Sequence, residues 1–133
     1  MNKQFYHPEL LQTPEGVRDI YGNECAMKQS LLDSINSVIK SYGFHSIQTP
    51  SFEFFDIFNK ERGTVAANEM YKFFDRDNNT LVLRPDITPS IARSVAKYYE
   101  NESFQVRLCY NGNTYINNTS YQGKLKEITQ AGA

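Results

Sequence analysis

The chain of 133 residues contains no tryptophan and no long apolar run, and its net charge is -1 at pH 7. A nearly neutral chain argues against binding of nucleic acid through phosphate contacts, because such contacts need clustered lysine and arginine. No apolar run approaches the length of a membrane span, and the N-terminus lacks the apolar core of a signal peptide. We therefore expect a cytoplasmic protein that binds neither nucleic acid nor membrane.

The reactive residue types are few and do not form a catalytic or metal-binding set. Cys25 and Cys109 lie far apart without metal-type spacing, which favours two reduced, buried thiols. Neither His7 nor His45 has a serine, cysteine or acidic neighbour that suggests a triad. The seven glycines are scattered, so no glycine-rich phosphate cradle exists. We expect no metal and no cofactor.

The chain has instead nine phenylalanines and nine tyrosines, and it is long enough for one domain with a real core. Residues 1–12 look like a loose N-terminal arm, and residues 13–133 look like the domain. A helix is expected from about residue 24 to 42, with Asn23 as its N-cap and Gly43 in the left-handed position that ends it. Its apolar stripe consists of Met27, Leu31, Ile35, Val38 and Tyr42.

The middle of the chain predicts a strand, a hairpin and a second helix. Residues 44–50 form an extended segment closed by proline, and residues 52–58 are expected to be a helical turn that carries aromatic rings into the core. The polar residues 59–68 predict a mobile loop. Residues 70–75 and 80–83 then predict two strands around an Asx-rich turn.

In the second helix we expect Thr88 as N-cap and Pro89 at the first helical position. Its expected inward face consists of Ile91, Ala92, Val95, Ala96 and Tyr99.

The last quarter of the chain predicts two strands joined by a polar loop. Apolar and polar residues alternate over residues 104–111, a short run at 114–116 meets the loop at 117–120, and residues 123–132 follow. The order of elements indicates an α+β fold, a mostly antiparallel sheet flanked by helices, with the helices on one side.

The segment 84–88 and the hairpin 107–132 together resemble the amino-acid-binding turn and the second motif of histidyl-tRNA synthetase. The helix and the strand ending at Pro50 resemble the first motif of class II synthetases, although a simple helix–strand unit would look the same. The resemblance implies the class II catalytic-domain fold from about residue 13 to the C-terminus. Because such proteins are considerably longer, we expect a fragment truncated before its remaining strands.

Within this family the closer resemblance is to the non-charging relatives, the regulatory subunits of ATP phosphoribosyltransferase. In the synthetase an arginine of the hairpin holds the ATP α-phosphate, and an acidic residue two places on contacts adenine. The matching positions here are Ile116 and Asn118. A hydrocarbon cannot neutralise a phosphate, and a neutral amide does not replace a carboxylate. The resemblance therefore implies a synthetase fold without nucleotide chemistry and without a catalytic residue.

The candidate ligand site consists of Asp86, Thr88 and Gln130. In the synthetase the turn with a carboxylate and a hydroxyl receives the α-amino group of histidine, and a glutamine at the position of Gln130 also contacts the amino acid. From the residues alone, Thr88 could only cap its helix, Asp86 could only face a neighbouring arginine and Gln130 could only be a cross-strand partner.

Three further cations occupy positions that are basic in the synthetase. Arg107 matches an arginine whose default role is a structural ion pair. Lys124 and Lys126 stand where the synthetase has arginines near the nucleotide. They keep the positive charge but lose the planar fork that grips phosphate.

The resemblance implies a regulatory subunit of the first enzyme of histidine biosynthesis. Its expected partners are the catalytic subunit, which joins PRPP with ATP, and histidine as a feedback effector. A homodimer through the first-motif helix and strand is also expected. Two alternatives stay open: a genuine histidyl-tRNA synthetase fragment, and an interaction module that kept the fold but lost both ligands.

Overall fold

The computed structural model describes residues 8–59, 65–119 and 123–133, and in them the chain forms two three-stranded sheets. Strands β1 and β5 are parallel, and all other pairs are antiparallel. The first sheet has the order β1 (His45–Ser46), β5 (Leu108–Tyr115) and β6 (Glu127–Gly132), and the second has the order β2 (Phe52–Phe54), β4 (Thr80–Leu83) and β3 (Lys72–Phe74).

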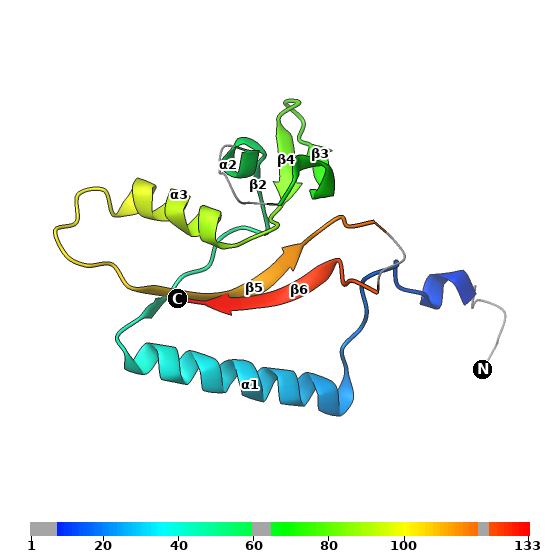
Figure 1. The fold of residues 1–133 in the computed structure, drawn as a ribbon, viewed down its shortest axis with the longest axis horizontal. Helices are drawn as coiled ribbons and strands as arrows, with labels where there is room; N and C mark the ends of the chain where they lie inside the picture. The colour runs from blue at the N-terminus through cyan, green and yellow to red at the C-terminus, as the bar shows by residue number, and fades with distance from the viewer. Residues whose placement is uncertain (1–7, 60–64, 120–122) are drawn as a thin grey trace.

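The helices lie on both sides of the first sheet. Helix α1 (Gly22–Ser41) runs along one side of β5 and β6, and α3 (Thr88–Tyr98) lies on the other side together with the second sheet (Figure 1). The expected α+β class with a mostly antiparallel sheet is confirmed. The expectation that the helices lie on one side is wrong, because the second sheet turns the chain over the opposite face before α3 begins.

The last two strands form one long hairpin. The register runs from Tyr110 opposite Gly132 to Tyr115 opposite Glu127. The expected hairpin is confirmed, but β5 starts only at Leu108 and then passes through Gly112 without a break. The sequence favoured a strand from residue 104 and a separate short run after Gly112. The strand continues through Gly112 because its residues pair with β6 on both sides of the glycine. Gly112 itself has to be small, since a Cβ there would lie 2.5 Å from Nη2 of Arg84.

Helix α1 begins and ends close to the expected residues. Tyr21 occupies the N-cap position and makes no side-chain capping bond, so the prediction of Asn23 as N-cap is wrong. Gly43 has φ +81° and its N–H donates to the carbonyl of Lys40 at 3.0 Å, as expected for the residue that ends a helix.

The face that α1 packs against β5 is not the predicted stripe. The half-buried apolar residues of the helix are Leu32, Ile35 and Ile39. Ile35 alone belongs to the predicted set, and the other four side chains are 60% to 73% exposed: Met27, Leu31, Val38 and Tyr42. Two apolar stripes therefore lie side by side on α1, and the sheet covers one of them.

The second sheet carries a small apolar core of Phe58, Met70 and Val82. Phe58 lies on the short helix α2 (Asp56–Asn59), which is the predicted helical turn. Phe52 and Phe54 lie on strand β2 instead and are exposed, so the prediction that this whole segment turns as a helix into the core is wrong. Alternation along β2 buries Glu53 and turns both rings outward.

Helix α3 differs from the prediction by about one residue. Ile87 is its N-cap, and Thr88 is already its first residue, followed by Pro89. The buried side chains of the helix are Pro89, Ser90 and Ser94. Ala92 and Ala96 are exposed, so the expected inward face is wrong at these two positions. Helix α2 lies against this helix.

Several predictions concern loops and termini. Residues 8–11 form a short 3-10 helix, η2 (Pro8–Leu11), within the expected loose arm, and η3 (Ala67–Glu69) lies in the expected loop. The rest of the arm and parts of both predicted loops lie outside the described residues. Cys109 is buried as expected, but Cys25 is exposed. Among the described residues, no helix is both long and apolar enough to cross a membrane.

Candidate functional site

The structure brings the three predicted site residues into one hydrogen-bonded group. The Gln130 amide nitrogen donates to Oδ1 of Asp86 at 3.0 Å, and the Gln130 carbonyl oxygen accepts from the N–H of Ile87 at 3.2 Å. The N–H of Thr88 also donates to Oδ1 of Asp86 at 3.2 Å. Gln130 is therefore a cross-strand partner that orients the Asp86 carboxylate, which is half-buried.

The site is assembled from both sheets. Asp86 lies in the turn between β4 and α3, and Thr88 is the first residue of α3, so both follow the last strand of the second sheet in the chain. Gln130 lies on β6, opposite Gly112 of β5. The geometry of the site therefore depends on how the two sheets are held against each other.

Tyr110 is a fourth member that the sequence analysis missed. Its hydroxyl lies 3.4 Å from the Thr88 hydroxyl. Tyr110 pairs with Gly132 across the hairpin, where a Cβ would lie 2.7 Å from the tyrosine hydroxyl. Glycine at that position therefore lets the ring reach across to Thr88. The feature that could have pointed to Tyr110 is an aromatic residue opposite a glycine on the neighbouring strand. This pairing can be recognised only when the strand register is known.

This arrangement fits a ligand with a primary ammonium group. Among the described residues, both bonds to Asp86 go to Oδ1, so Oδ2 remains free to accept. Thr88, whose N–H is bonded to Asp86, also has an exposed hydroxyl that can donate or accept. An ammonium needs a charged acceptor and neutral oxygens around it, and a charge-assisted bond of this kind is stronger than a neutral one.

At the positions expected to meet a nucleotide, Ile116 and Asn118 form hydrogen bonds within the hairpin. The N–H of Ile116 donates to the carbonyl of Lys126 at 2.9 Å, and the Asn118 amide donates to the carbonyl of Leu125 at 3.3 Å. The Lys126 side chain packs over Gly16, where a Cβ would lie 2.6 Å from its Cγ. Lys124 is exposed. These residues close the hairpin onto itself and onto the N-terminal segment.

Within residues 8–59, 65–119 and 123–133, Arg107 forms no ion pair of the expected kind. Its guanidinium donates to the carbonyl of Tyr42 at 3.0 Å, and the group lies 5.9 Å from the centre of the Phe44 ring. The arginine thus ties the C-terminal end of α1 to the start of β5. The prediction is wrong because a helix C-terminus leaves carbonyls without partners, and these attract a cation as well as a carboxylate does.

A second polar network lies further along the hairpin. The Asn113 amide donates to Oε1 of Glu127 at 2.7 Å and accepts from the Thr129 hydroxyl at 3.0 Å. Burial raises the pKa of the Tyr115 phenol, and the neighbouring Glu127 carboxylate raises it further. These contacts stabilise the hairpin and do not reach Asp86.

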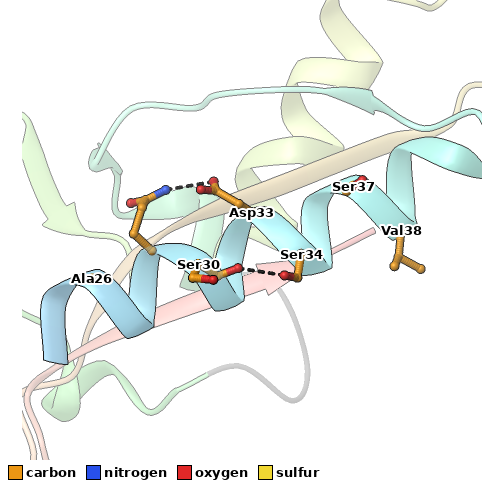
Figure 2. A pocket seen from close by; sticks show the side chains of 7 residues that line it. Ala26, Ser30, Asp33, Ser34, Ser37 and Val38 are labelled. Carbon is orange, nitrogen blue, oxygen red and sulfur yellow. Dashed lines mark hydrogen bonds between the residues drawn. The ribbon is translucent and has the colours of Figure 1, made fainter. Parts of the chain in front are cut away.

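A surface depression follows an exposed face of α1, and Asp86 is not among the residues that line it (Figure 2). The Gln29 amide donates to Asp33 at 2.9 Å, and the Ser34 hydroxyl donates to the carbonyl of Ser30 at 2.8 Å. All lining residues belong to the helix, and their polar groups bond within it, so this depression has no convergent groups for a ligand. The described residues also hold no cluster of metal-ligating side chains.

Comparison with solved structures defines the class of protein. The fold is similar to an ATP phosphoribosyltransferase regulatory subunit/histidyl-tRNA synthetase from Bacillus halodurans, with a TM-score of 0.81 and 31% identity over 92% of this chain and 31% of that one. It is also similar to apo histidyl-tRNA synthetase from S. aureus, with a TM-score of 0.72 and 25% identity over 90% of this chain and 27% of that one. The chain therefore has the class II synthetase catalytic-domain fold.

Sequence comparison gives the particular family. The family described as histidyl-tRNA synthetase matches residues 16–133, and the chain belongs to it. Two curated relatives, both named ATP phosphoribosyltransferase regulatory subunit, come from Acetivibrio thermocellus (43% identical, 92% of this chain) and Clostridium acetobutylicum (39% identical, 90% of this chain). The chain spans about 29% of the length of each.

Proposed function

We propose that the chain is part of a regulatory subunit of ATP phosphoribosyltransferase that binds histidine and catalyses no reaction itself. The observation that carries the proposal is the contrast between the two halves of the site. Asp86, Thr88 and Gln130 form an intact acceptor group for an ammonium. The positions that would meet a nucleotide hold the hydrocarbon of Ile116 and the backbone-bonded amide of Asn118. The relatives at 39% and 43% identity carry the regulatory name, which supports the same function.

In this proposal histidine acts as an effector. Its α-ammonium binds between Oδ2 of Asp86 and the Thr88 hydroxyl, and Gln130 keeps the carboxylate turned toward it. The signal to the catalytic subunit is then a coupling free energy between two binding sites. The subunit works in the cytoplasm, where histidine biosynthesis supplies the effector, and it acts as a homodimer.

Loss of nucleotide chemistry is tested by ATP–pyrophosphate exchange with histidine on the intact subunit. We expect no turnover, because Ile116 offers no cation at the position that holds the α-phosphate in the synthetase. The Ile116→Arg variant should also be inactive, since the adenine contact is still missing. A histidyl-tRNA synthetase assayed in parallel is the positive control. Clear exchange by the wild-type subunit would replace the proposal with the synthetase alternative.

Histidine binding is tested by calorimetry on the intact subunit. Asp86→Ala should weaken binding by about 1.5–3 kcal/mol, the usual cost of removing a charged hydrogen-bond partner. Asp77→Ala, in the distant β3–β4 turn, is the matched control and should leave the affinity unchanged. Equal affinity in both variants would place the ligand elsewhere. No binding by the wild type would favour the interaction module without ligands.

A further inference from the structure

Arg84 is a buried cation held almost entirely by uncharged oxygens. Its side chain is 6% exposed and comes from the residue directly after β4. Nε donates to the carbonyl of Asn113 at 2.9 Å. Nη1 donates to the carbonyl of Thr49 at 2.8 Å, to the Thr49 hydroxyl at 3.2 Å and to the carbonyl of Pro50 at 3.2 Å.

Burying a guanidinium without a carboxylate partner costs free energy of folding, so an arginine at this position needs an explanation. Burial lowers the pKa of the Arg84 guanidinium, and the nearby Tyr115 and Glu53 offset this only in part. Glu53 itself forms an ion pair with Arg93 at 2.7 Å. Replacing a buried charge by a well-packed apolar residue is often neutral or stabilising, so stability alone does not account for an arginine here.

The backbone around Arg84 joins segments from both sheets. The N–H of Arg84 donates to the carbonyl of Ser51 at 3.0 Å, next to β2. The carbonyl of Arg84 accepts from the N–H of Tyr115 on β5 at 3.0 Å. The guanidinium lies close to Gly112, where a Cβ would come within 2.5 Å of Nη2. Strands of the two sheets do not pair with each other among the described residues, so Arg84 is a major connection between them.

We propose that Arg84 is the positioning residue of the ligand site, because it fixes Asp86 and Thr88 from one sheet against Gln130 and Tyr110 from the other. Asp86 follows Arg84 by two residues, and Gln130 pairs with Gly112, the residue under the guanidinium. The planar guanidinium of Arg84 donates to Asn113 on one side and, at the same time, to Thr49 and Pro50 on the other side. Lysine keeps the charge but is a point donor, so it cannot hold both sides.

The proposal is tested with the Arg84→Lys variant of the intact subunit by two measurements, histidine affinity and amide exchange. The first of these rests on the proposed histidine site. We expect histidine affinity to fall about tenfold or more, the equivalent of one hydrogen bond to a charged group. We also expect the Ile87 amide, which donates to Gln130 across the two sheets, to exchange with solvent about tenfold faster. Val82→Ala is the control, since it weakens the same small sheet from its core and leaves all site contacts in place.

The two readouts separate failure of this proposal from failure of the proposed function. Amide exchange needs no histidine, so it decides the role of Arg84 even if the wild type binds none. If Arg84→Lys does not fold, Gly112→Ala provides the same test with the arginine retained, because the added methyl group must displace the guanidinium. If the tested variant matches Val82→Ala in both histidine affinity and Ile87 amide exchange, Arg84 is only a structural residue and the proposal is overturned.

Discussion

At the scale of single residues, Arg84 and Ser90 show two outcomes for a buried polar side chain. Arg84 has acceptors from two segments of the chain. The Ser90 hydroxyl is fully buried in α3 and has no hydrogen-bond partner among the described residues. A buried hydroxyl without a partner loses its hydration and gains nothing in return.

We expect Ser90→Ala to stabilise the protein by about 1 kcal/mol, since it removes the unpaired hydroxyl without opening a cavity. Urea denaturation followed by circular dichroism measures the change as a higher midpoint at an unchanged slope. Ser37→Ala, on the exposed face of α1, serves as a control for helix propensity alone. A variant less stable than the wild type would show that Ser90 has a partner that matters.

The sequence could bring candidate residues together where they are close in the chain. Asp86 and Thr88 are two residues apart, and Gln130 was added by the resemblance; the structure joins all three by hydrogen bonds, and their role in ligand binding stays a prediction. Tyr110 and Arg84 could not be predicted in their roles. Their partners are a hydroxyl and carbonyls that lie between 22 and 35 residues away, so the contacts exist only once the two sheets are packed.

At the scale of elements, the β3–β4 hairpin is stabilised by one carboxylate. Asp75 accepts from the N–H of Asp77 at 2.9 Å, from the N–H of Asn79 at 2.8 Å and from the Asn79 amide at 2.8 Å. The bond from the Asn79 side chain lowers the pKa of Asp75 most, and the backbone bonds of Asn79 and Asp77 add to it. Asn78 adopts a positive φ of 60°, which asparagine tolerates well in a tight turn.

Asp75→Ala should lower the thermal midpoint at neutral pH, and the difference from the wild type should disappear in acid. Because the folded state lowers this pKa, the stabilisation is complete above the unfolded pKa of about 3.9 and is lost as the pH falls through the lower folded value. Melting curves between pH 7 and 2 check the trend. The control is Asp77→Ala, which keeps every bond to Asp75. A difference that persists undiminished at pH 2 would contradict this assignment.

Helix existence was predictable, but helix orientation was not. Spacing of three and four residues identified α1 and α3, and Gly43 marked an end. On α1, however, Leu32, Ile35 and Ile39 satisfy the same spacing as the stripe that the sequence favoured. Periodicity alone cannot choose between adjacent apolar faces, because the choice depends on which face meets β5.

At the scale of the whole molecule, two apolar surfaces lack a covering element in the described part of the chain. One is the exposed stripe of α1, formed by Met27, Leu31, Val38 and Tyr42. The other is a face of the second sheet, where the exposed rings of Phe52 and Phe73 meet edge to face with centres 5.7 Å apart. Exposed apolar patches of this kind commonly mark interaction surfaces, and a symmetric dimer is the commonest way to cover them. The first surface lies on the helix through which we propose the homodimer.

The proposed homodimer predicts that a charge on the α1 stripe separates the protomers. Leu31→Glu should weaken dimerisation by about 2 kcal/mol or more, roughly 30-fold in the dissociation constant, because an unpaired carboxylate would be buried twice in a symmetric interface. Gln29→Glu adds the same charge on the opposite side of the helix and should leave the dimer intact. Sedimentation equilibrium on the intact subunit over a wide concentration range measures both constants. Strictly monomeric wild-type protein at high concentration, or equal dissociation of the two variants, would show that the stripe has another role.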